Sequence, residues 1–333
     1  MTYKATLMPG DGIGPEVCES AIQIVEAAGV KIDWEFAPLG ESAIAEHGTP
    51  LPDVTIASIE RNKLALKGPT ATPKGKGFSS VNVGLRVKFD LFANIRPVRS
   101  FKGVPSRYED IDLVVVRENV EDFYAGLQNN DSDEVGAADG IITRTGSRRI
   151  ARSAFDMADH LGYSKIVAVH KSNIIKMYAK FVEEAQAVSE KYPYIEFSEK
   201  IIDNMCMQLV INPYQFQVIL APNLFGDILS DLCACLVGGL GLAPGANIGN
   251  GIAIYEAVHG TAPDIAGQNK ANPGALILSA KMMLDQIGEK DAAARIMKAL
   301  EEVLAEGKYV TGDINKTNPV STTRMTQAII DRL

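Results

Sequence analysis

Two aspartates spaced four residues apart form the sharpest candidate site in this sequence. Asp227 and Asp231 lie in the segment NLFGDILSD, and a helix over that segment would place both carboxylates on one face. Neighbouring carboxylates repel each other unless a cation bridges them, and Mg²⁺ or Mn²⁺ is suited to one or two carboxylates plus substrate oxygens. The alternative is that both residues only stabilise the start of the helix. Asp203, which follows the run EFSEKII, is a possible third ligand.

A second candidate site consists of three arginines and neighbouring polar side chains. Segment 68–86, GPTATPKGKGFSSVNVGLR, is a polar, glycine-rich loop that runs into a helix, and two further arginines directly follow apolar runs. The candidate residues are Ser80, Asn82, Arg86, Arg96 and Arg117. Guanidinium groups just past the carboxyl ends of parallel strands lie where such sheets bind ligands, and each can hold a carboxylate by two hydrogen bonds. Three of them predict a substrate with more than one carboxylate; structural ion pairs are the alternative.

Two further features could take part in chemistry, and each has a simpler explanation. Tyr124 and Lys171 are possible proton-transfer groups, because burial and a neighbouring cation can lower the pKa of a lysine towards neutrality. A lysine after a strand is, however, more often a surface charge. The segment PGDGIGPE, residues 9–16, follows an expected strand, where a dinucleotide-binding loop would lie. Its glycines do not have the G-x-G-x-x-G spacing, which favours a tight strand-to-helix turn.

The composition is that of a globular protein and argues against several classes of function. The 333 residues, 46% of them hydrophobic, suffice for two domains and carry too much apolar surface for a disordered chain. A formal net charge of -8 argues against nucleic acid as a partner. Four scattered cysteines predict neither a disulfide scaffold nor a zinc site. Segment 232–255 is uncharged, but its glycines and proline argue against a membrane helix, and the chain begins with an expected strand rather than a signal peptide.

Alternating strands and helices must position these residues. Short apolar runs predict strands at 3–8, 31–36, 91–95, 113–116, 166–170 and 217–221. Helical periodicity predicts helices over 15–28, 148–161, 179–191, 224–236, 273–287, 292–306 and 322–333. This alternation predicts an α/β fold with a largely parallel sheet. Because no linker divides the chain, two domains would have to share it by crossing over and back.

Five motifs, taken in order, resemble one enzyme family. The motifs GDGIGPE, RENVEDFYAG, NLFGDILSD, VGGLGLAPGANIG and HGTAPDIAG are similar to those of the β-decarboxylating dehydrogenases of isocitrate, 3-isopropylmalate, homoisocitrate and tartrate. The resemblance covers nearly the whole chain. It implies an isopropylmalate dehydrogenase-like fold without a Rossmann-type domain. The expected large, cofactor-binding domain comprises residues 1–95 and 240–333, and the smaller domain, 96–239, would carry the substrate and metal sites and the dimer interface.

The resemblance also implies a role for each candidate residue. The substrate-binding set is Thr72, Ser80, Asn82, Arg86, Arg96 and Arg117. The metal ligands are Asp203, Asp227 and Asp231, with Asp203 lent by the partner subunit. The proton-transfer pair is Tyr124 and Lys171, with Lys171 again from the partner. The cofactor-binding residues are His259, Gly260, Ala262, Asp264, Ile265 and Asn272.

Two positions favour one member of the family. The pattern S-x-N-x-x-x-R resembles isocitrate dehydrogenases, whereas isopropylmalate enzymes place apolar residues there, so Asn82 is the main discriminator. Asp264 and Ile265 stand where NADP-dependent bacterial relatives have lysine and tyrosine, which favours NAD. The chain departs from many isocitrate enzymes at Ala71, usually threonine, and at Asn250, commonly aspartate. The segment 127–139 is also shorter than the dimer clasp of longer relatives.

The resemblance therefore implies a specific oxidoreductase. We expect an NAD-dependent isocitrate dehydrogenase of the tricarboxylic acid cycle that requires Mg²⁺ or Mn²⁺, converts a tricarboxylate and has neither nucleic-acid nor membrane partners. The expected assembly is a homodimer with active sites shared between subunits. The expected location is the cytoplasm, or the mitochondrial matrix if a transit peptide has been removed. Two alternatives are a homoisocitrate dehydrogenase and a non-catalytic regulatory subunit of a hetero-oligomeric relative.

Overall fold

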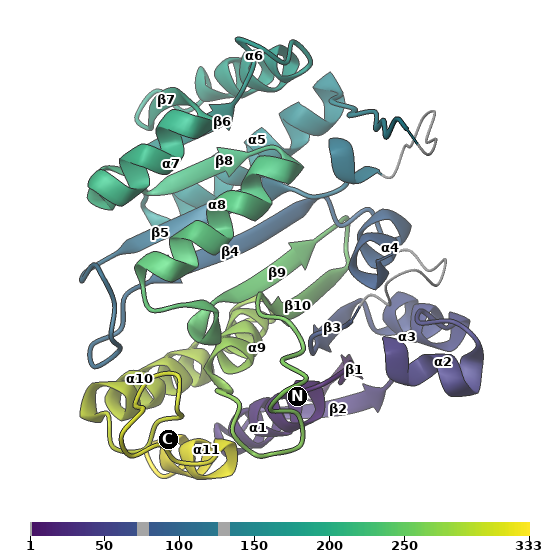
Figure 1. Ribbon diagram of the computed structural model, residues 1–333, viewed down its shortest axis with the longest axis vertical. Helices are drawn as coiled ribbons and strands as arrows, with labels where there is room; N and C mark the ends of the chain where they lie inside the picture. The colour runs from purple at the N-terminus through teal and green to yellow at the C-terminus, as the bar shows by residue number, and fades with distance from the viewer. Residues whose placement is uncertain (1, 72–79, 126–133) are drawn as a thin grey trace.

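One ten-stranded sheet runs through the length of the molecule, with helices packed on both of its faces (Figure 1). A computed structural model describes residues 2–71, 80–125 and 134–333. The strand order is β2-β1-β3-β10-β9-β4-β5-β8-β6-β7. The outer strands pair in parallel, whereas the pairings β10–β9, β9–β4 and β4–β5 are antiparallel. The predicted α/β class is confirmed, with an antiparallel centre between two parallel halves.

The strands are short and are joined mostly by helices. They are β1 (Thr2–Met8), β2 (Lys31–Phe36), β3 (Leu64–Lys67), β4 (Ala93–Arg99), β5 (Asp112–Glu118), β6 (Lys165–His170), β7 (Glu196–Ile201), β8 (Val218–Ala221), β9 (Pro244–Ile248) and β10 (Ala253–Ala257). The helices in the first half of the chain are α1 (Gly14–Ala27), α2 (Glu41–His47), α3 (Asp53–Asn62), α4 (Val81–Lys88) and α5 (Arg144–Leu161). Those in the second half are α6 (Tyr178–Ser189), α7 (Ile202–Ile211), α8 (Asn223–Leu236), α9 (Gly274–Gln286), α10 (Lys290–Glu306) and α11 (Thr322–Ile330).

Every strand and helix predicted from the sequence is present; β2 has the predicted bounds, and the others are shifted at one or both ends. The helix predicted from residue 148 begins at Arg144, because the Thr143 side chain accepts a hydrogen bond from the Gly146 amide and caps an earlier turn. The strand predicted at 91–95 lies instead at Ala93–Arg99. Strands β3 and β7 and helices α2, α3 and α7 were not predicted, and no bounds were predicted for β9 and β10. These elements are short, and β7 is an edge strand with little buried surface, so their apolar patterns are weak.

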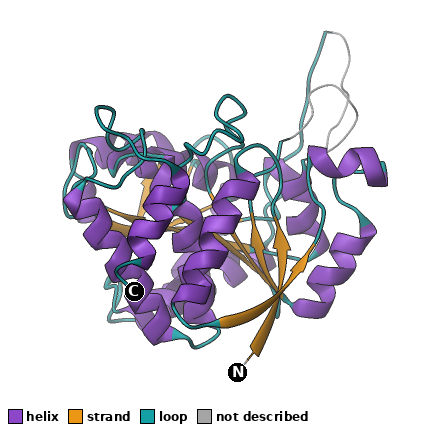
Figure 2. Ribbon diagram, turned by 90° about the horizontal axis from the view of Figure 1, so that it is seen from below, coloured by secondary structure: helices purple, strands orange, loops and turns teal. Residues whose placement is uncertain are grey.

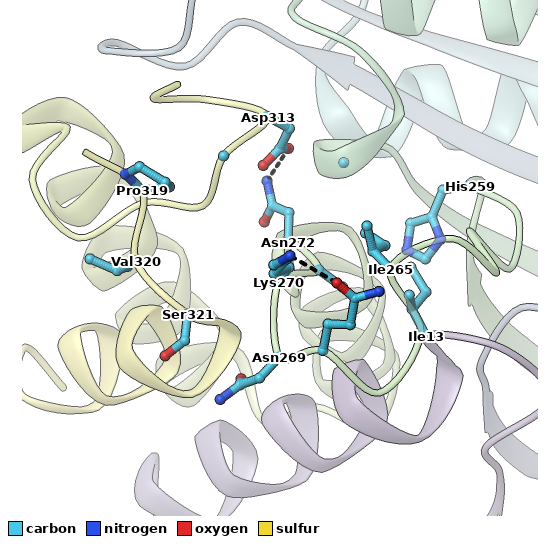
Figure 3. A pocket seen from close by; sticks show the side chains of 14 residues that line it. Ile13, His259, Ile265, Asn269, Lys270, Asn272, Asp313, Pro319, Val320 and Ser321 are labelled. Atoms are coloured by element: carbon cyan, nitrogen blue, oxygen red, sulfur yellow. Dashed lines mark hydrogen bonds between the residues drawn. The ribbon is translucent and has the colours of Figure 1, made fainter. Parts of the chain in front are cut away.

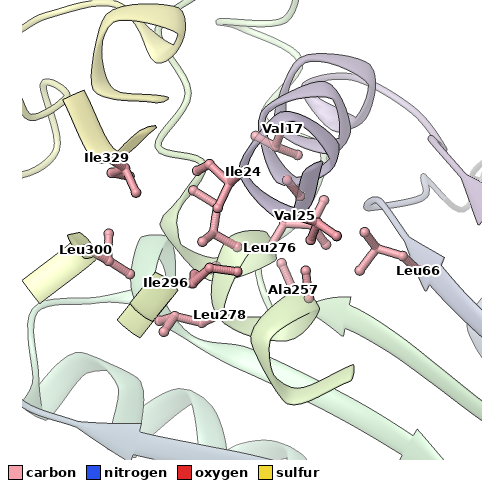
Figure 4. Packing of buried hydrophobic residues seen from close by; sticks show 14 of the residues in the cluster. Val17, Ile24, Val25, Leu66, Ala257, Leu276, Leu278, Ile296, Leu300 and Ile329 are labelled. Atoms are coloured by element: carbon pink, nitrogen blue, oxygen red, sulfur yellow. The ribbon is translucent and has the colours of Figure 1, made fainter. Parts of the chain in front are cut away.

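The strands at one end of the sheet bury side chains in two separate cores. Leu7 and Leu66 face a core built with α1, α9, α10 and α11, whereas Met8 and Ala65 face a core built with α3 and α4. This alternation is the period of two expected for strands covered on both faces. Figure 4 shows the first core, in which Ile24 from α1, Leu276 from α9 and other aliphatic side chains interlock.

The middle of the chain builds a third core around the other half of the sheet. Its buried residues lie between Ala93 and Val237, on strands β4, β5, β6 and β8 and on helices α5 to α8. Ile95 and Ile248, on the antiparallel strands β4 and β9, pack against both this core and the α1–α9 core. In Figure 1 the two chain ends, in purple and yellow, accordingly lie together at one end of the molecule.

The view from below in Figure 2 shows the sheet enclosed between helices, with long loops along one edge. Among the helices of the described ranges, none is long and apolar enough to cross a bilayer. The uncharged stretch 232–255 ends α8 and then forms β9 and β10, as buried loop and strand rather than a span.

Candidate active site

The glycine-rich segment after β1 forms a tight turn. Gly10 and Gly12 have positive φ values of 71° and 60°, and a Cβ on Gly12 would lie 2.0 Å from the Thr261 carbonyl oxygen. Between them the Asp11 carboxylate accepts hydrogen bonds from the backbone amides of Glu41 and Ser42, each 3.0 Å long. The segment therefore joins the start of α2 to β1 by side-chain capping. The interpretation as a strand-to-helix turn is confirmed.

Arg96 and Arg117 lie within strands rather than beyond strand ends, which corrects the expected placement. Arg96 is in the middle of β4 and Arg117 is the second-last residue of β5, and these two strands pair antiparallel. The expectation was wrong because both strands continue past the apolar runs LFANI and DLVVV. Arg117 is only 1% exposed. A buried guanidinium requires an acidic or amide partner, so the neighbours of each arginine are informative.

Arg117, Tyr124 and Asp227 form one cluster at the start of α8. Arg117 donates to an Asp227 carboxylate oxygen and, from Nε, to Asn223 Oδ1 at 3.0 Å. The Tyr124 hydroxyl donates to the other Asp227 oxygen at 3.2 Å, and its ring lies 5.5 Å from the Arg117 guanidinium. Burial and the Asp227 charge raise the pKa of Tyr124, so the phenol holds its proton at neutral pH.

Arg96 connects this cluster to Asp231. Its guanidinium lies 3.6 Å from Asp227 and 3.7 Å from Asp231, so both carboxylates on α8 face the same strand. Burial and the neighbouring Asp227 charge raise the pKa of Asp231 against the pull of Arg96. A divalent cation would relieve this repulsion, and two hard carboxylate ligands with open positions for substrate oxygens fit Mg²⁺ or Mn²⁺. Across the described ranges no three His, Cys, Asp or Glu side chains are grouped closely enough to hold a metal ion.

Lys171 and Asp203 form a separate ion pair. Lys171 Nζ lies 2.5 Å from Asp203 Oδ1, with Lys171 directly after β6 and Asp203 in the first turn of α7. The Lys171 ammonium lowers the pKa of Asp203. The structure of one chain therefore does not bring this pair into the Tyr124–Asp227 cluster, although the sequence assigned both residues to one site.

A cavity of about 130 Å³ lies beside Arg96, between the sheet and α4. We call it the smaller cavity. Asn82 and Arg86 from α4 line it together with Arg96, so three of the predicted substrate-binding residues face one space. Ser80 directly precedes α4, two residues before Asn82. Thr72 lies outside the described residues.

A buried ion pair forms another wall of the smaller cavity. Lys67, 2% exposed at the end of β3, lies 2.5 Å from Glu256 on the neighbouring strand β10. Burial raises the pKa of Glu256, but Lys67 and Arg86 outweigh burial and hold it at about 2. Asn247 Nδ2 donates to the second Glu256 oxygen at 2.7 Å. Glu256 is therefore a fixed anion.

Positive charge dominates the region between the smaller cavity and α8. Burial beside Arg96 and Arg86 lowers the pKa of Arg117 to about 9, and burial lowers that of Arg96. Both remain charged at neutral pH but are destabilised by their mutual repulsion. The Nε atoms of Arg86 and Arg96 are buried and have no hydrogen-bond partner among the residues placed in the structure. Unpaired buried donors of this kind fit an anionic ligand.

A larger cavity, of about 600 Å³, adjoins the smaller one at His259, which lines both (Figure 3). Ile265 and Asn272 also line it, so three of the predicted cofactor-binding residues surround one space of nucleotide size. Asn272 donates from Nδ2 to Asp313 at 2.9 Å, which holds this carboxylate in the wall. Burial lowers the pKa of His259, which favours a neutral ring.

The remaining cofactor-binding residues predicted from the sequence lie around these cavities. Gly260 lines the smaller cavity rather than the larger one. Asp264 is exposed and precedes the lining residue Ile265, and its carbonyl accepts a 2.7 Å hydrogen bond from Gln268. Ala262 has a positive φ of 39° in the same loop.

Residues 4–329 match the family described as isocitrate/isopropylmalate dehydrogenase. The chain belongs to this family. The match spans both chain ends and the middle, so it covers the sheet and the residues of both cavities.

Relatives in the isocitrate/isopropylmalate dehydrogenase family are similar over most of their length. A regulatory subunit of the mitochondrial NAD isocitrate dehydrogenase from Dictyostelium discoideum is 49% identical, over 96% of this chain and 89% of that protein. Catalytic subunit 5 of the mitochondrial NAD enzyme from Arabidopsis thaliana is 48% identical, over 99% and 88%. The crystal structure of isocitrate dehydrogenase from Methylococcus capsulatus has a TM-score of 0.96 at 47% identity, covering 99% of both chains.

Several residues of the site were not found from the sequence. Lys67, Asn94 and Glu256 line the smaller cavity, and Asp313 lines the larger one. The available signal was a charged residue at the end of two apolar runs, LALK and AIYE. The pairing of β3 with β10 joins residues 189 positions apart, and no local pattern shows that these two charges meet.

Proposed function

We propose that this chain catalyses the metal-dependent oxidative decarboxylation of isocitrate. Isocitrate and NAD⁺ would give 2-oxoglutarate, CO₂ and NADH. The observation that carries the proposal is the convergence of Arg86, Arg96 and Asn82 on one cavity, beside the carboxylates of Asp227 and Asp231. A polycarboxylate would satisfy the unpaired guanidinium donors, and its remaining oxygens would complete a metal site.

The arginines bind and orient the substrate carboxylates. Arg86 and Arg96 each present a buried Nε, and bidentate hydrogen bonds from guanidinium to carboxylate fix the plane of the bound group. Asn82 offers an amide for a distal carboxylate, where an apolar side chain would suit an alkyl substituent instead. Its Oδ1 accepts a 3.3 Å hydrogen bond from Thr70, which leaves the Nδ2 donors available to the ligand.

Asp227 and Asp231 are the two ligands that one chain would give to the metal. A divalent cation held there would polarise the hydroxyl and carboxylate oxygens of the substrate and stabilise negative charge as CO₂ departs. Tyr124, which keeps its proton beside Asp227, would donate a proton to the carbon that loses CO₂. Lys171 would accept the proton of the substrate hydroxyl, which requires a partner subunit to bring it to this cluster.

The larger cavity is the proposed binding site for NAD, which accepts the hydride. Asp313 in its wall and Asp264 beside Ile265 offer carboxylates for ribose hydroxyls and disfavour an additional phosphate. His259 borders both cavities, so a dinucleotide along the larger cavity would reach the substrate at this residue.

We also propose a homodimer that shares its active sites across α7 and α8. Met207 and Ile211 on α7 are 52% and 64% exposed. Val210 on α7 and Ile228 on α8 are also exposed apolar side chains. Exposed apolar surface beside an incomplete site favours a partner that supplies Lys171 and Asp203. In this proposal residues 96–239 form the dimerisation domain, and residues 1–95 with 240–333 form the cofactor domain.

The name of one relative supports a second candidate function. Because the Dictyostelium protein is a regulatory subunit, this chain could bind a carboxylate without turnover as part of a hetero-oligomer. The presence of Tyr124, Lys171 and the three aspartates favours the catalytic function, because a regulatory subunit has no need of them. Cytoplasm and mitochondrial matrix are the candidate locations; the plant and Dictyostelium relatives are named mitochondrial, and fractionation of cells would decide between them.

One set of initial-rate measurements tests the function. The purified chain is assayed alone with isocitrate, homoisocitrate or 3-isopropylmalate, each with NAD and NADP, with Mg²⁺ or Mn²⁺ and after EDTA. Isocitrate with NAD should be fastest, and EDTA should abolish the rate. A faster rate with homoisocitrate would reassign the substrate. Binding of isocitrate without turnover would favour the regulatory function.

A further inference from the structure

Asn94 presents an unpaired, buried hydrogen-bond acceptor at the smaller cavity. It lies on β4, two residues before Arg96 on the same face of the strand, and is 1% exposed. It lines the cavity, and its Oδ1 has no partner among the residues described. A buried acceptor without a donor destabilises the folded protein, so a ligand that supplies the donor would bind favourably.

The orientation of the Asn94 amide is imposed by Glu256 through Asn247. The Glu256 carboxylate can only accept hydrogen bonds, so Asn247 turns its Nδ2 towards it at 2.7 Å. The Asn247 Oδ1 then points the other way and accepts from Asn94 Nδ2 at 2.9 Å. Turning the Asn94 amide over would place its Oδ1 against the Oδ1 of Asn247, and two acceptors cannot share a hydrogen bond. The charge on Glu256 therefore fixes Oδ1 of Asn94 as an acceptor.

The ligand group that matches this acceptor must carry an N–H or O–H. Substrate carboxylates carry only acceptors, and they match the unpaired Nε atoms of Arg86 and Arg96 instead. The reacting groups of the two ligands carry two donors, the substrate hydroxyl and the carboxamide of the nicotinamide ring; the ribose hydroxyls of NAD have the carboxylates of the larger cavity as their proposed partners. The hydroxyl has to give its proton to the base and its oxygen to the metal. The carboxamide N–H₂ is therefore the donor that remains.

We propose that Asn94 Oδ1 accepts a hydrogen bond from the nicotinamide carboxamide and so positions the ring against the substrate. This inference rests on the proposed function. The carboxamide reaches the acceptor from the His259 side, where the two cavities adjoin. The hydrogen bond sets the rotation of the ring about its bond to the ribose, and with it the face that receives hydride.

A dinucleotide that lacks the donor provides the test. In reduced 3-acetylpyridine adenine dinucleotide an acetyl group replaces the carboxamide, so the carbonyl is kept and the N–H₂ is lost. Neither this analogue nor NADH can accept a hydride, so dissociation constants can be measured by calorimetry in the presence of isocitrate and Mg²⁺ without turnover. The wild type should bind NADH about tenfold or more tightly than the analogue. In Asn94→Leu the two constants should become equal.

Asn119 provides a matched control from the same network. It donates to the same Asn247 Oδ1, also at 2.9 Å, and is equally buried, but it does not line either cavity. Asn119→Leu should keep the preference for NADH over the analogue, whatever it does to stability. Asn94→Ala, which also removes the acceptor, serves if the leucine variant does not fold.

Three outcomes would overturn the inference. Equal affinity of the wild type for both dinucleotides would mean that the carboxamide makes no specific hydrogen bond. An unchanged preference in the Asn94 variants would assign the donor to another residue. Weaker isocitrate binding by the same factor with both dinucleotides would assign Asn94 to the substrate hydroxyl. Failure of the proposed function is recognised separately, because the wild type would then not oxidise isocitrate at all, and the inference would fall with it.

Discussion

Asp227 contacts two arginines and a tyrosine, so few substitutions at this position would preserve the cluster. Arg117 and Tyr124 donate to its two oxygens, and Arg96 lies 3.6 Å away. Asp227→Asn would remove one ligand charge from the proposed metal and leave the buried Arg117 without its anion. We expect kcat/KM for isocitrate to fall by about a hundredfold or more, as removal of a polarising group typically does. The measurement is a steady-state assay across a Mg²⁺ titration.

A control separates this effect from the loss of any carboxylate. Asp33→Asn removes an exposed aspartate on β2 whose only ion pair in the described ranges is with the exposed Lys4 on β1. That variant should retain full activity. Wild-type turnover of Asp227→Asn at saturating Mg²⁺ would remove Asp227 from the metal site.

We also expect cofactor choice to depend on single residues, at and beside the lining of the larger cavity. Asp264 is exposed and Ile265 lines the cavity, so replacing them by lysine and tyrosine would put a cation and a phenol where a 2′-phosphate could bind. Each charge-assisted hydrogen bond contributes about 1.5–3 kcal/mol. We expect the wild type to prefer NAD and the double variant to shift the ratio of kcat/KM towards NADP by about two powers of ten.

The control for that shift adds the same charge elsewhere. Asp291→Lys, on an exposed position in the first turn of α10, changes the net charge as Asp264→Lys does. Its cofactor ratio should equal that of the wild type. An unaltered ratio in the double variant would show that Asp264 and Ile265 do not select the cofactor.

At the scale of elements, local pattern predicted the long helices and the strands with apolar runs, but not the strands that complete the site. Strands β9 and β10 follow α8 in a stretch with almost no charged residues. Neither the helical nor the strand period of apolar residues stands out there. Their place in the sheet depends on pairing with β4 and β3, far away in the chain. The Lys67–Glu256 pair arises from the pairing of β3 with β10, and the Arg96–Asp231 contact arises from the packing of α8 on β4. The spacing of residues could therefore suggest the chemistry but not which charges meet.

The β3–β10 pairing depends on the buried ion pair at its end. Lys67→Met would leave Glu256 buried without its ammonium partner, and breaking such a pair typically costs about 3–5 kcal/mol. The exposed pair of Lys4 with Asp33 offers the matched control, because exposed pairs contribute at most about 1 kcal/mol. Urea unfolding of Lys67→Met and Lys4→Met should therefore differ by about 2 kcal/mol or more. Equal losses would mean that water screens the inner pair.

The same carboxylate predicts a dependence of stability on pH. The folded protein holds the pKa of Glu256 at about 2, below its ordinary value of 4.5, so the folded state binds this proton more weakly than the unfolded state. The resulting stabilisation is present above about pH 4.5 and is lost as the pH falls through 2. A difference of that size corresponds to about 3 kcal/mol. Glu256→Gln should remove this part of the acid destabilisation, measured as the unfolding free energy from pH 6 to pH 3; parallel curves for the two proteins would contradict the assignment.

At the scale of the whole molecule, one chain keeps the residues of the proposed active site in two separate groups. The cluster of Arg96, Arg117 and the α8 aspartates does not include Lys171, which pairs with Asp203 at β6 and α7. Exposed apolar side chains lie on α7 and α8 beside both. Sequence alone assigned these residues to a single site only through family resemblance, because the contact between them would form across two chains.

Subunit mixing tests this arrangement. Lys171→Ala and Asp227→Asn should each be inactive as homodimers. In a heterodimer of the two, one site combines the intact Asp227 of the first chain with the intact Lys171 of the second, and the other site carries both defects. If sites are shared, the heterodimer, isolated through two different affinity tags, should therefore have about half of the wild-type activity. A matched control pairs Lys171→Ala with Asp203→Asn: each chain then lends a damaged pair to the other, so neither site is intact and activity should stay absent. If instead each chain completes its own site, both heterodimers would be inactive while sedimentation still gives dimers, and Lys171 would have to act beside Asp203 within one chain.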